Sequence, residues 1–200
     1  MDWGSLFTAI STIVIAWFGY NQYTKNKKTD AKIKQIEEQD KAKNKLRADN
    51  SMVIFGVLWD VLYEIGADRV YIVQPHPLGH EEMLSIYYEV KSSGVQGMKD
   101  RIQNLRIAEI GTFSSDMAQN SIMYINDVEN EVSNKYAQSL MATYGSENLI
   151  IKRLANNEYK WTGSIFCEYL EPTSVDREKA KKVLTNAALR IQYILPEFQN

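Results

Sequence analysis

The stretch "ADRVYIVQPHPLGHEEMLSIYYEV", residues 67–90, decides the fold class of this chain. It contains two runs rich in β-branched and aromatic residues, "RVYIV" and "MLSIYYEV", and such runs are typical of β-strands. Pro75, Pro77 and Gly79 lie between the two runs, and prolines and glycines mark turns. The stretch therefore predicts two strands joined by a bend.

The bend contains both histidines of the chain, His76 and His80, which are followed by Glu81 and Glu82. On a helix, histidines four residues apart would resemble a pair of metal ligands. Pro77 lies between them and disfavours a helix, so their spacing does not predict that the two side chains lie on one helix face. We therefore expect no metal site at this bend.

Helical patterns lie on both sides of the two predicted strands. Apolar residues recur at helical spacing over 52–65, and Gly66 follows as a stop. Between 99 and 127 the sequence predicts only short helices and a brief strand. An amphipathic helix is expected over 129–144, then a hairpin that turns at "ANNEY", then a final helix capped by Ser174. This order predicts an α+β domain, an antiparallel sheet framed by helices.

Composition limits what this domain can bind. With 200 residues, 44% of them hydrophobic, the chain can form one substantial core. It has 23 Lys and Arg against 25 Asp and Glu, but residues 51–200 carry 14 basic and 19 acidic side chains. Nucleic-acid binding needs a basic face, so this acidic excess argues against nucleic acid as a partner.

The amino-terminal residues are apolar enough to predict a membrane anchor. Residues 3–24 form a run of 22 uncharged residues, which as a helix would span about 33 Å, close to the roughly 30 Å of a bilayer core. A signal peptide would have basic residues before the run, whereas here Asp2 precedes it and "KNKK" follows. We therefore expect residues 1–24 to form a single transmembrane helix.

The flanks of this run predict its orientation. Aromatic residues are typical of the two membrane interfaces, and lysines are enriched on the cytoplasmic side. The expected anchor residues are Trp3, Trp17, Tyr20, Lys25, Lys27 and Lys28. Because the lysines follow the run, we expect a single-pass inner (cytoplasmic) membrane protein with its amino terminus outside and its main domain, residues 51–200, in the cytoplasm.

Residues 25–50 predict a charged helical stalk between the anchor and the domain. They contain no Gly or Pro, and large apolar residues are limited to Ile33, Ile36 and Leu46, too few for a self-sufficient coiled coil. The stalk has two interpretations. It is either a rod that couples the domain to the membrane, or a basic spacer lying against anionic lipid headgroups.

Catalytic motifs are missing from the sequence. It has no GxxxxGK for a nucleoside phosphate and no GxGxxG for a dinucleotide. The single cysteine, Cys167, lies in an apolar run typical of a strand, where a thiol usually serves as a small hydrophobe, and nothing places a histidine beside it. It cannot form an intrachain disulfide, which fits a reducing compartment. We expect a protein that is not an enzyme.

The order of elements, with the residues in it, resembles the GAF domain, a small-ligand sensor module related to PAS domains. The resemblance covers roughly residues 51–195 and rests on "ADRVYIVQPH", "SIYYEV", "IGTFSSDMAQNSIMYIND" and "LIIKRLANNEYKWTGSIFCEYLEP". It is closest in kind to small membrane-anchored GAF-like proteins of bacteria and phages. Such proteins often show His-Asn-Gly after a strand; here His76 stands at the first position and Pro77 and Leu78 replace the rest.

The resemblance implies that one face of the sheet packs on helices and that the other encloses a ligand. The expected ligand-binding residues are Gln74, His76, Tyr88, Glu89, Phe113 and Phe166. The alternative is that these aromatic residues fill a closed core. The identity of any cofactor stays unknown at this stage, and the expected partners are the lipid membrane, a small molecule, and a homodimer mate or another protein.

Two functions are compatible with these features. The first is a membrane-anchored sensor that binds a small ligand or a protein partner in the cytoplasm and signals through it. The second is a phage-encoded structural or lysis-related membrane protein that uses the GAF-like domain for assembly.

Overall fold

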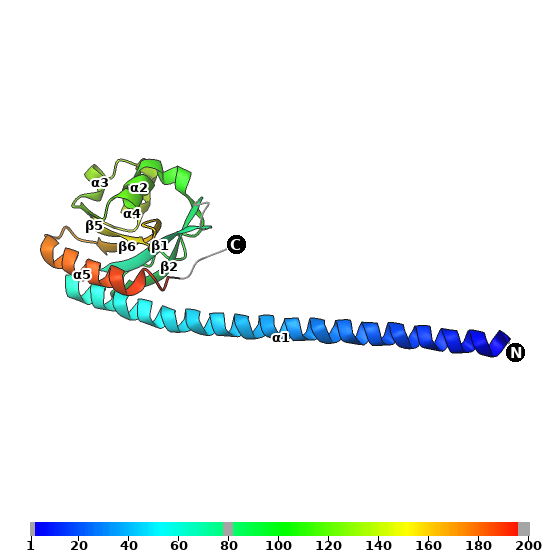
Figure 1. Cartoon of the computed structure of the whole chain (residues 1–200). Helices are drawn as coiled ribbons and strands as arrows, with labels where there is room; N and C mark the ends of the chain where they lie inside the picture. Colours follow the sequence, from blue (N-terminus) through cyan, green and yellow to red (C-terminus); the bar gives the residue numbers. More distant parts are fainter. Residues whose placement is uncertain (1–2, 78–81, 196–200) are drawn as a thin grey trace. The chain divides into compact units, whose positions relative to one another are not determined.

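The computed structural model describes residues 3–77 and 82–195, shown in Figure 1. In the first 31 residues it describes the side chains of Trp17, Gln22, Lys25 and Lys27 only. The chain divides into two compact units, residues 1–48 and residues 49–200. Helix α1 spans Trp3–Ile65, so its last turns belong to the second unit.

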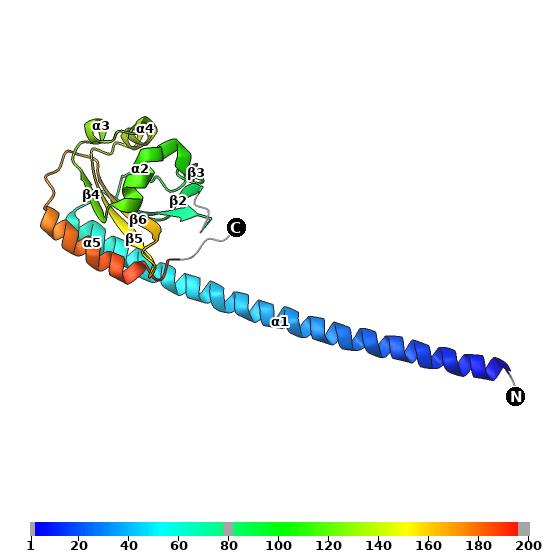
Figure 2. The ribbon, with the colours of Figure 1, turned by 45° about the horizontal axis from the view of Figure 1, so that its top comes forward.

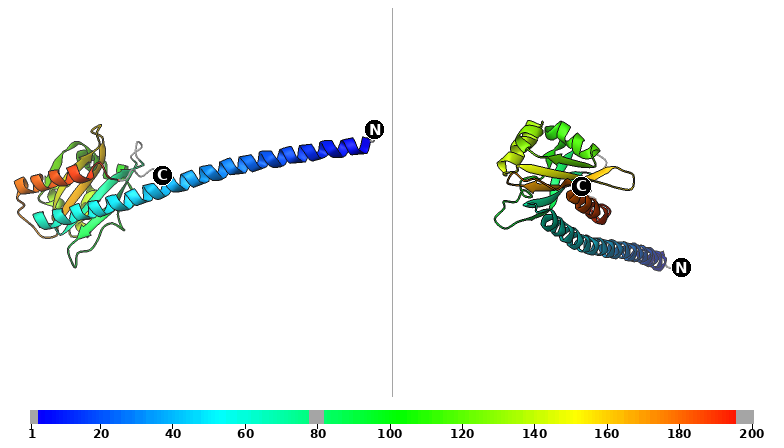
Figure 3. Two further views of the ribbon diagram at one scale, coloured as in Figure 1. Left: turned by 60° about the horizontal axis from the view of Figure 1, so that its bottom comes forward. Right: turned by 90° about the vertical axis from the view of Figure 1, so that its left-hand side faces the viewer.

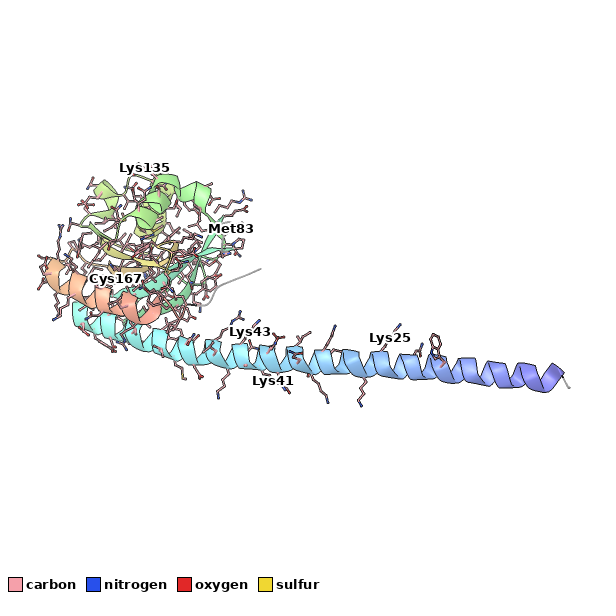
Figure 4. All side chains as sticks on the ribbon, viewed as in Figure 1. Lys25, Lys41, Lys43, Met83, Lys135 and Cys167 are labelled. Carbon is pink, nitrogen blue, oxygen red and sulfur yellow. The ribbon has the colours of Figure 1, made fainter. Side chains whose placement is uncertain are left out.

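The first unit is helical, and its described side chains are all exposed. Figure 4 shows Lys25, Lys41 and Lys43 pointing away from the helix. Ile33 and Ile36 are also exposed, at 47% and 56%. Over the described residues, no helix is both long and apolar enough to cross a membrane. Of the six predicted anchor residues, Trp17, Lys25 and Lys27 are exposed, and the side chains of the other three, Trp3, Tyr20 and Lys28, lie outside the described residues.

The second unit is built on a six-stranded antiparallel sheet with the strand order β3-β2-β1-β6-β5-β4. The strands are β1 Arg69–His76, β2 Met83–Lys91, β3 Leu105–Arg106, β4 Ile122–Ile125, β5 Asn148–Ala155 and β6 Trp161–Tyr169. The helices after α1 are α2 Ile107–Gln119, α3 Val128–Glu131, α4 Lys135–Thr143 and α5 Arg177–Ile191. The prediction of an α+β domain with a helix-framed antiparallel sheet is confirmed.

Helices cover both faces of the sheet (Figure 2). The end of α1 and α5 lie side by side on one face (Figure 3), where they pack on residues such as Ile72 and Cys167. Helices α2 and α4 lie on the other face, over Tyr71 and Phe166. Successive residues of β1 alternate between the two cores, as the period of a strand requires.

Several helix boundaries differ from the sequence prediction, and local capping explains most of the differences. The helix predicted over 129–144 is two helices, because the Asn134 side chain accepts a hydrogen bond from Ala137 N and begins α4 there. Helix α5 begins after Asp176, whose carboxylate accepts from Lys179 N, and not after Ser174. The β1 strand continues through Pro75 to His76.

Candidate functional site

A small cavity lies in the core between the sheet and helices α2 and α4. Its volume is about 30 Å³, room for one or two water molecules. Ligand pockets usually have roughly 300–1,000 Å³, so this cavity is far smaller than a usual ligand pocket. It is lined by Tyr71, Val73, Leu84, Met98, Ile102, Leu105, Ile110, Phe113, Met117, Ala137, Leu140, Met141 and Phe166.

Three methionines form part of the cavity wall. Met98 comes from the loop between β2 and β3, Met117 from α2 and Met141 from α4, and all are buried. Methionine is flexible and adapts to irregular space. The helix that carries Met117 is itself interrupted, because Gly111 has a φ of +23° inside α2, in a region that favours glycine. This wall can therefore repack more readily than one made of branched side chains.

A buried polar cluster adjoins the cavity through Tyr71, which is one of the lining residues. Arg69 and Glu168 form an ion pair with no exposed side-chain surface, and Arg69 Nε lies 2.6 Å from Glu168 Oε2. The Tyr71 hydroxyl donates to Glu168 Oε1 over 2.6 Å. Burial, together with the Glu168 charge, holds the pKa of Tyr71 well above its usual value. Tyr71 stacks on Phe166 with ring centres 5.0 Å apart, so the cluster is joined directly to the cavity wall.

Arg69 of this cluster and Glu89 of β2 hold the loop of residues 92–104, which contributes Met98 and Ile102 to the cavity wall. Arg69 Nη1 donates to Gln96 O over 2.6 Å. The Glu89 carboxylate accepts from Met98 N at 2.6 Å and from Lys99 N at 3.2 Å. The position of Met98 in the cavity wall thus depends on two charged side chains that belong to the sheet.

The predicted ligand-binding residues do not all lie at this cavity. Phe113 and Phe166 line it, and Glu89 holds the loop beside it. Tyr88 lies on the opposite face of the sheet, where its hydroxyl is 3.3 Å from Ser51 Oγ and its ring packs edge-on against Phe55.

Gln74 and His76 are buried near the far end of β1 and are not among the lining residues. His76 Nε2 is 2.9 Å from Ser85 Oγ, and burial lowers the pKa of its imidazole. The second histidine of the bend, His80, lies outside the described residues. Among the residues that are described, no three His, Cys, Asp or Glu side chains come together as a metal site.

Cys167 is fully buried on the sheet face that packs against α1 and α5. Burial and the neighbouring Glu168 charge raise the pKa of its thiol, so it is protonated at neutral pH. A protonated, buried thiol is a poor nucleophile.

The residues that sequence reasoning missed are Arg69, Tyr71 and Glu168. A usable signal was present for two of them. Arg69 opens the strand "RVYIV", and Glu168 interrupts the apolar run "SIFCEYL". A charged residue in a buried strand is expected to have an ionic partner, which would have suggested pairing these two.

Comparison with solved structures finds several proteins of similar fold. The chromophore-binding domain of a bacteriophytochrome from R. palustris matches with 14% identity and a TM-score of 0.55, over 72% of this chain and 54% of that one. The PixJ GAF domain of Thermosynechococcus elongatus matches with 9% identity and a TM-score of 0.60, over 74% and 87%. A domain from a protein assigned as a two-component sensor histidine kinase of Sinorhizobium meliloti matches with 13% identity and a TM-score of 0.53, over 69% and 85%.

These likenesses show the fold. The GAF-like fold expected from the sequence is confirmed, and the chain spans about half the length of the bacteriophytochrome fragment that it matches. No protein-family model matches the sequence, and no curated protein matches it.

Proposed function

We propose that this chain is a membrane-anchored, non-enzymatic sensor whose GAF-like domain lies on the cytoplasmic side and binds a small, largely apolar molecule between the sheet and helices α2 and α4. The fold supports a sensing role, because the similar solved structures include photoreceptors and a sensor kinase domain. The 22-residue uncharged run at residues 3–24 supports the anchor.

The observation that carries the proposal is the construction of the cavity wall. Met98, Met117 and Met141 meet at one small void, so a ligand can enter by displacing flexible side chains rather than the sheet. Because the lining is almost entirely apolar, the ligand is expected to be apolar or aromatic over most of its surface. The buried hydrogen-bonded pair of Tyr71 and Glu168 provides a polar end to this otherwise apolar site.

Native mass spectrometry of the full chain in a mild detergent tests this proposal. We expect the wild-type chain to carry a bound small molecule from the cell and the Ala137→Val variant to lose it, because Ala137 lines the cavity and two added methyl groups occupy it. Ala188→Val is the matched control, since Ala188 is equally buried in the core on the opposite face. Loss of the ligand in both variants, or no ligand in the wild type, would contradict the proposal.

A second function is favoured by the small size of the cavity. About 30 Å³ is a tenth or less of the volume of a usual ligand pocket, as expected of a domain that works through its surface. In that case the chain would be a structural or lysis-related membrane protein, of phage origin, that uses the domain for assembly. Wild-type protein without a bound molecule, combined with leakage of dye from vesicles that contain it, would support this function over sensing.

A further inference from the structure

A second hollow lies between the end of β5 and helix α5, across the sheet from the apolar cavity. Figure 1 shows α5 and α2 on opposite sides of the sheet. The volume of the hollow is about 180 Å³, below the roughly 300–1,000 Å³ of usual ligand pockets but enough for a single phosphate group. We call it the basic groove and define it by the charged and polar residues that line it, which are Ser121, Lys152, Arg153, Thr185 and Gln192.

Lys152 is the half-buried charge of the basic groove. It lies on β5 between Ile150 and Leu154, which belong to the core under α5, and alternate residues of a strand share a face. Its ammonium group donates to the Ser121 hydroxyl over 3.0 Å. Because a lysine ammonium has three protons to donate, Lys152 can also donate to an acceptor that enters the groove.

The charges that act on Lys152 are all positive. Burial lowers the pKa of its ammonium group, and the charges of Arg153 and Lys181 lower it further. Lys181 lies on α5 four residues before Thr185, so it is on the side of the helix that faces the groove. Among the described residues that line the groove, none carries a carboxylate.

This cluster differs from the rest of an acidic domain. The main domain carries 14 basic and 19 acidic side chains, and Arg190 of the same helix pairs with Asp60 at 3.0 Å. The Glu178 carboxylate acts on the Tyr124 hydroxyl and not on Lys152. Positive charges that are gathered without a carboxylate repel one another, and an anion between them replaces this repulsion with attraction.

Neutral donors complete the surroundings of such an anion. The Ser121 hydroxyl accepts from Lys152 and can donate its own proton, as can the Thr185 hydroxyl. The Gln192 side-chain oxygen lies 3.5 Å from Ala155 N, and its amide NH₂ group is a further donor. Ammonium, hydroxyl and amide donors around so small a space fit a compact anion with several acceptor oxygens. A phosphate group has this charge and these oxygens.

We propose that the basic groove binds phosphate, either as the free anion or as the phosphate group of a small soluble molecule, and that Lys152 and Lys181 neutralise its charge. The site lies across the sheet from the apolar cavity, so the inference goes beyond the proposed sensing function and does not depend on it. A phospholipid headgroup carries the same chemical group, and the experiment distinguishes the two sources.

Isothermal titration calorimetry with inorganic phosphate tests this site in the full chain, held in a maltoside detergent that contains no phosphate. We expect Lys152→Met and Lys181→Met each to weaken binding by about tenfold, because each variant removes one charge-assisted contact. Lys152→Arg keeps the charge and is expected to retain most of the affinity. Lys135→Met is the matched control, because Lys135 is an exposed lysine on α4, on the other side of the sheet (Figure 4). This control is expected to bind phosphate as the wild type does.

The outcomes separate a built site from a general effect of charge. Lys181 is exposed, so Lys181→Met tests the groove without disturbing the packed core. The absence of phosphate binding in the wild type, or an equal loss in Lys135→Met and the two groove variants, would overturn the proposal. Water-soluble dibutyryl phosphatidic acid is the second ligand. If it binds while inorganic phosphate does not, the groove takes a lipid headgroup and the proposed soluble ligand is wrong. None of these readouts involves the apolar cavity, so they can fail while the sensing function stands.

Discussion

Arg69 and Glu168 face each other from neighbouring strands, both without exposed side-chain surface. Removing one partner of a buried ion pair leaves an uncompensated charge and usually destabilises a protein by about 3–5 kcal/mol. We expect Glu168→Gln to lower the free energy of unfolding by about 3 kcal/mol, measured for the full chain in mild detergent by urea unfolding and near-ultraviolet circular dichroism. The surface variant Glu158→Gln removes a carboxylate that is 68% exposed and should cost less than about 1 kcal/mol. Equal effects of the two variants would show that the buried pair is dispensable.

His76 gives the domain a dependence on pH. Burial lowers its pKa in the folded chain below the ordinary value of 6.5, so the unfolded chain binds a proton at a higher pH than the folded chain does. Stability is therefore complete above pH 6.5 and decreases as the pH falls from there toward the folded pKa. We expect the urea midpoint to be lower at pH 5 than at pH 7.5, and this difference to shrink in His76→Gln. An unchanged difference in that variant would assign it to other groups.

Among the elements, the loop of residues 92–104 is held to the sheet by a set of hydrogen bonds, and Glu89 makes two of them. Glu89 accepts from two of its backbone amides, and each such charge-assisted bond contributes about 1.5–3 kcal/mol. We expect Glu89→Ala to speed amide hydrogen exchange at Met98 and Lys99 by at least tenfold. Glu109→Ala on the exposed side of α2 is the control and should leave these amides unchanged. Slow exchange in Glu89→Ala would mean that the loop is held by its other contacts.

The elements also differ in how well sequence pattern predicted them. The hairpin of β5 and β6 was predicted because "ANNEY" separates two strand-like runs, and Asn156 indeed closes the turn through its side chain. Helix α2 was predicted only in part, since Gly111 interrupts its periodicity and the helix continues across a kink. The short α3 and α4 were merged in the prediction because their apolar residues share one spacing, whereas the Asn134 cap separates them.

At the scale of the whole molecule, the membrane anchor is the prediction that governs location. A charged residue in the middle of a transmembrane helix costs about 2.5–3.5 kcal/mol. We expect the wild-type chain to sediment with membranes after high-speed centrifugation and Val14→Asp to shift it toward the supernatant. Ile36→Asp is the control, because Ile36 lies among charged residues after the run. A wild-type chain that stays in the supernatant would contradict the anchor, and protease access to residues 51–200 from outside the cell would contradict the orientation.

The sequence by itself determined the class of the fold. Alternating and helical periodicities are local properties of the chain, so the strands of residues 67–90, the hairpin and the final helix could be predicted without knowledge of their neighbours. The resemblance of these segments to GAF domains then led to the correct architecture. The same local patterns could indicate that Phe113 and Phe166 are buried, and both line the cavity.

Only the tertiary structure decided which buried residues meet. Gln74, His76 and Tyr88 lie in runs that are as apolar as the run that contains Phe166. The strand register and the irregularity between Ile72 and Val73 set the face of the sheet on which each side chain lies. The pairing of Arg69 with Glu168 joins residues 99 positions apart, a distance over which no local pattern extends. The size of the cavity likewise depends on how α2 and α4 pack on the sheet, because residual volume is the small difference between the space available and the side chains that fill it.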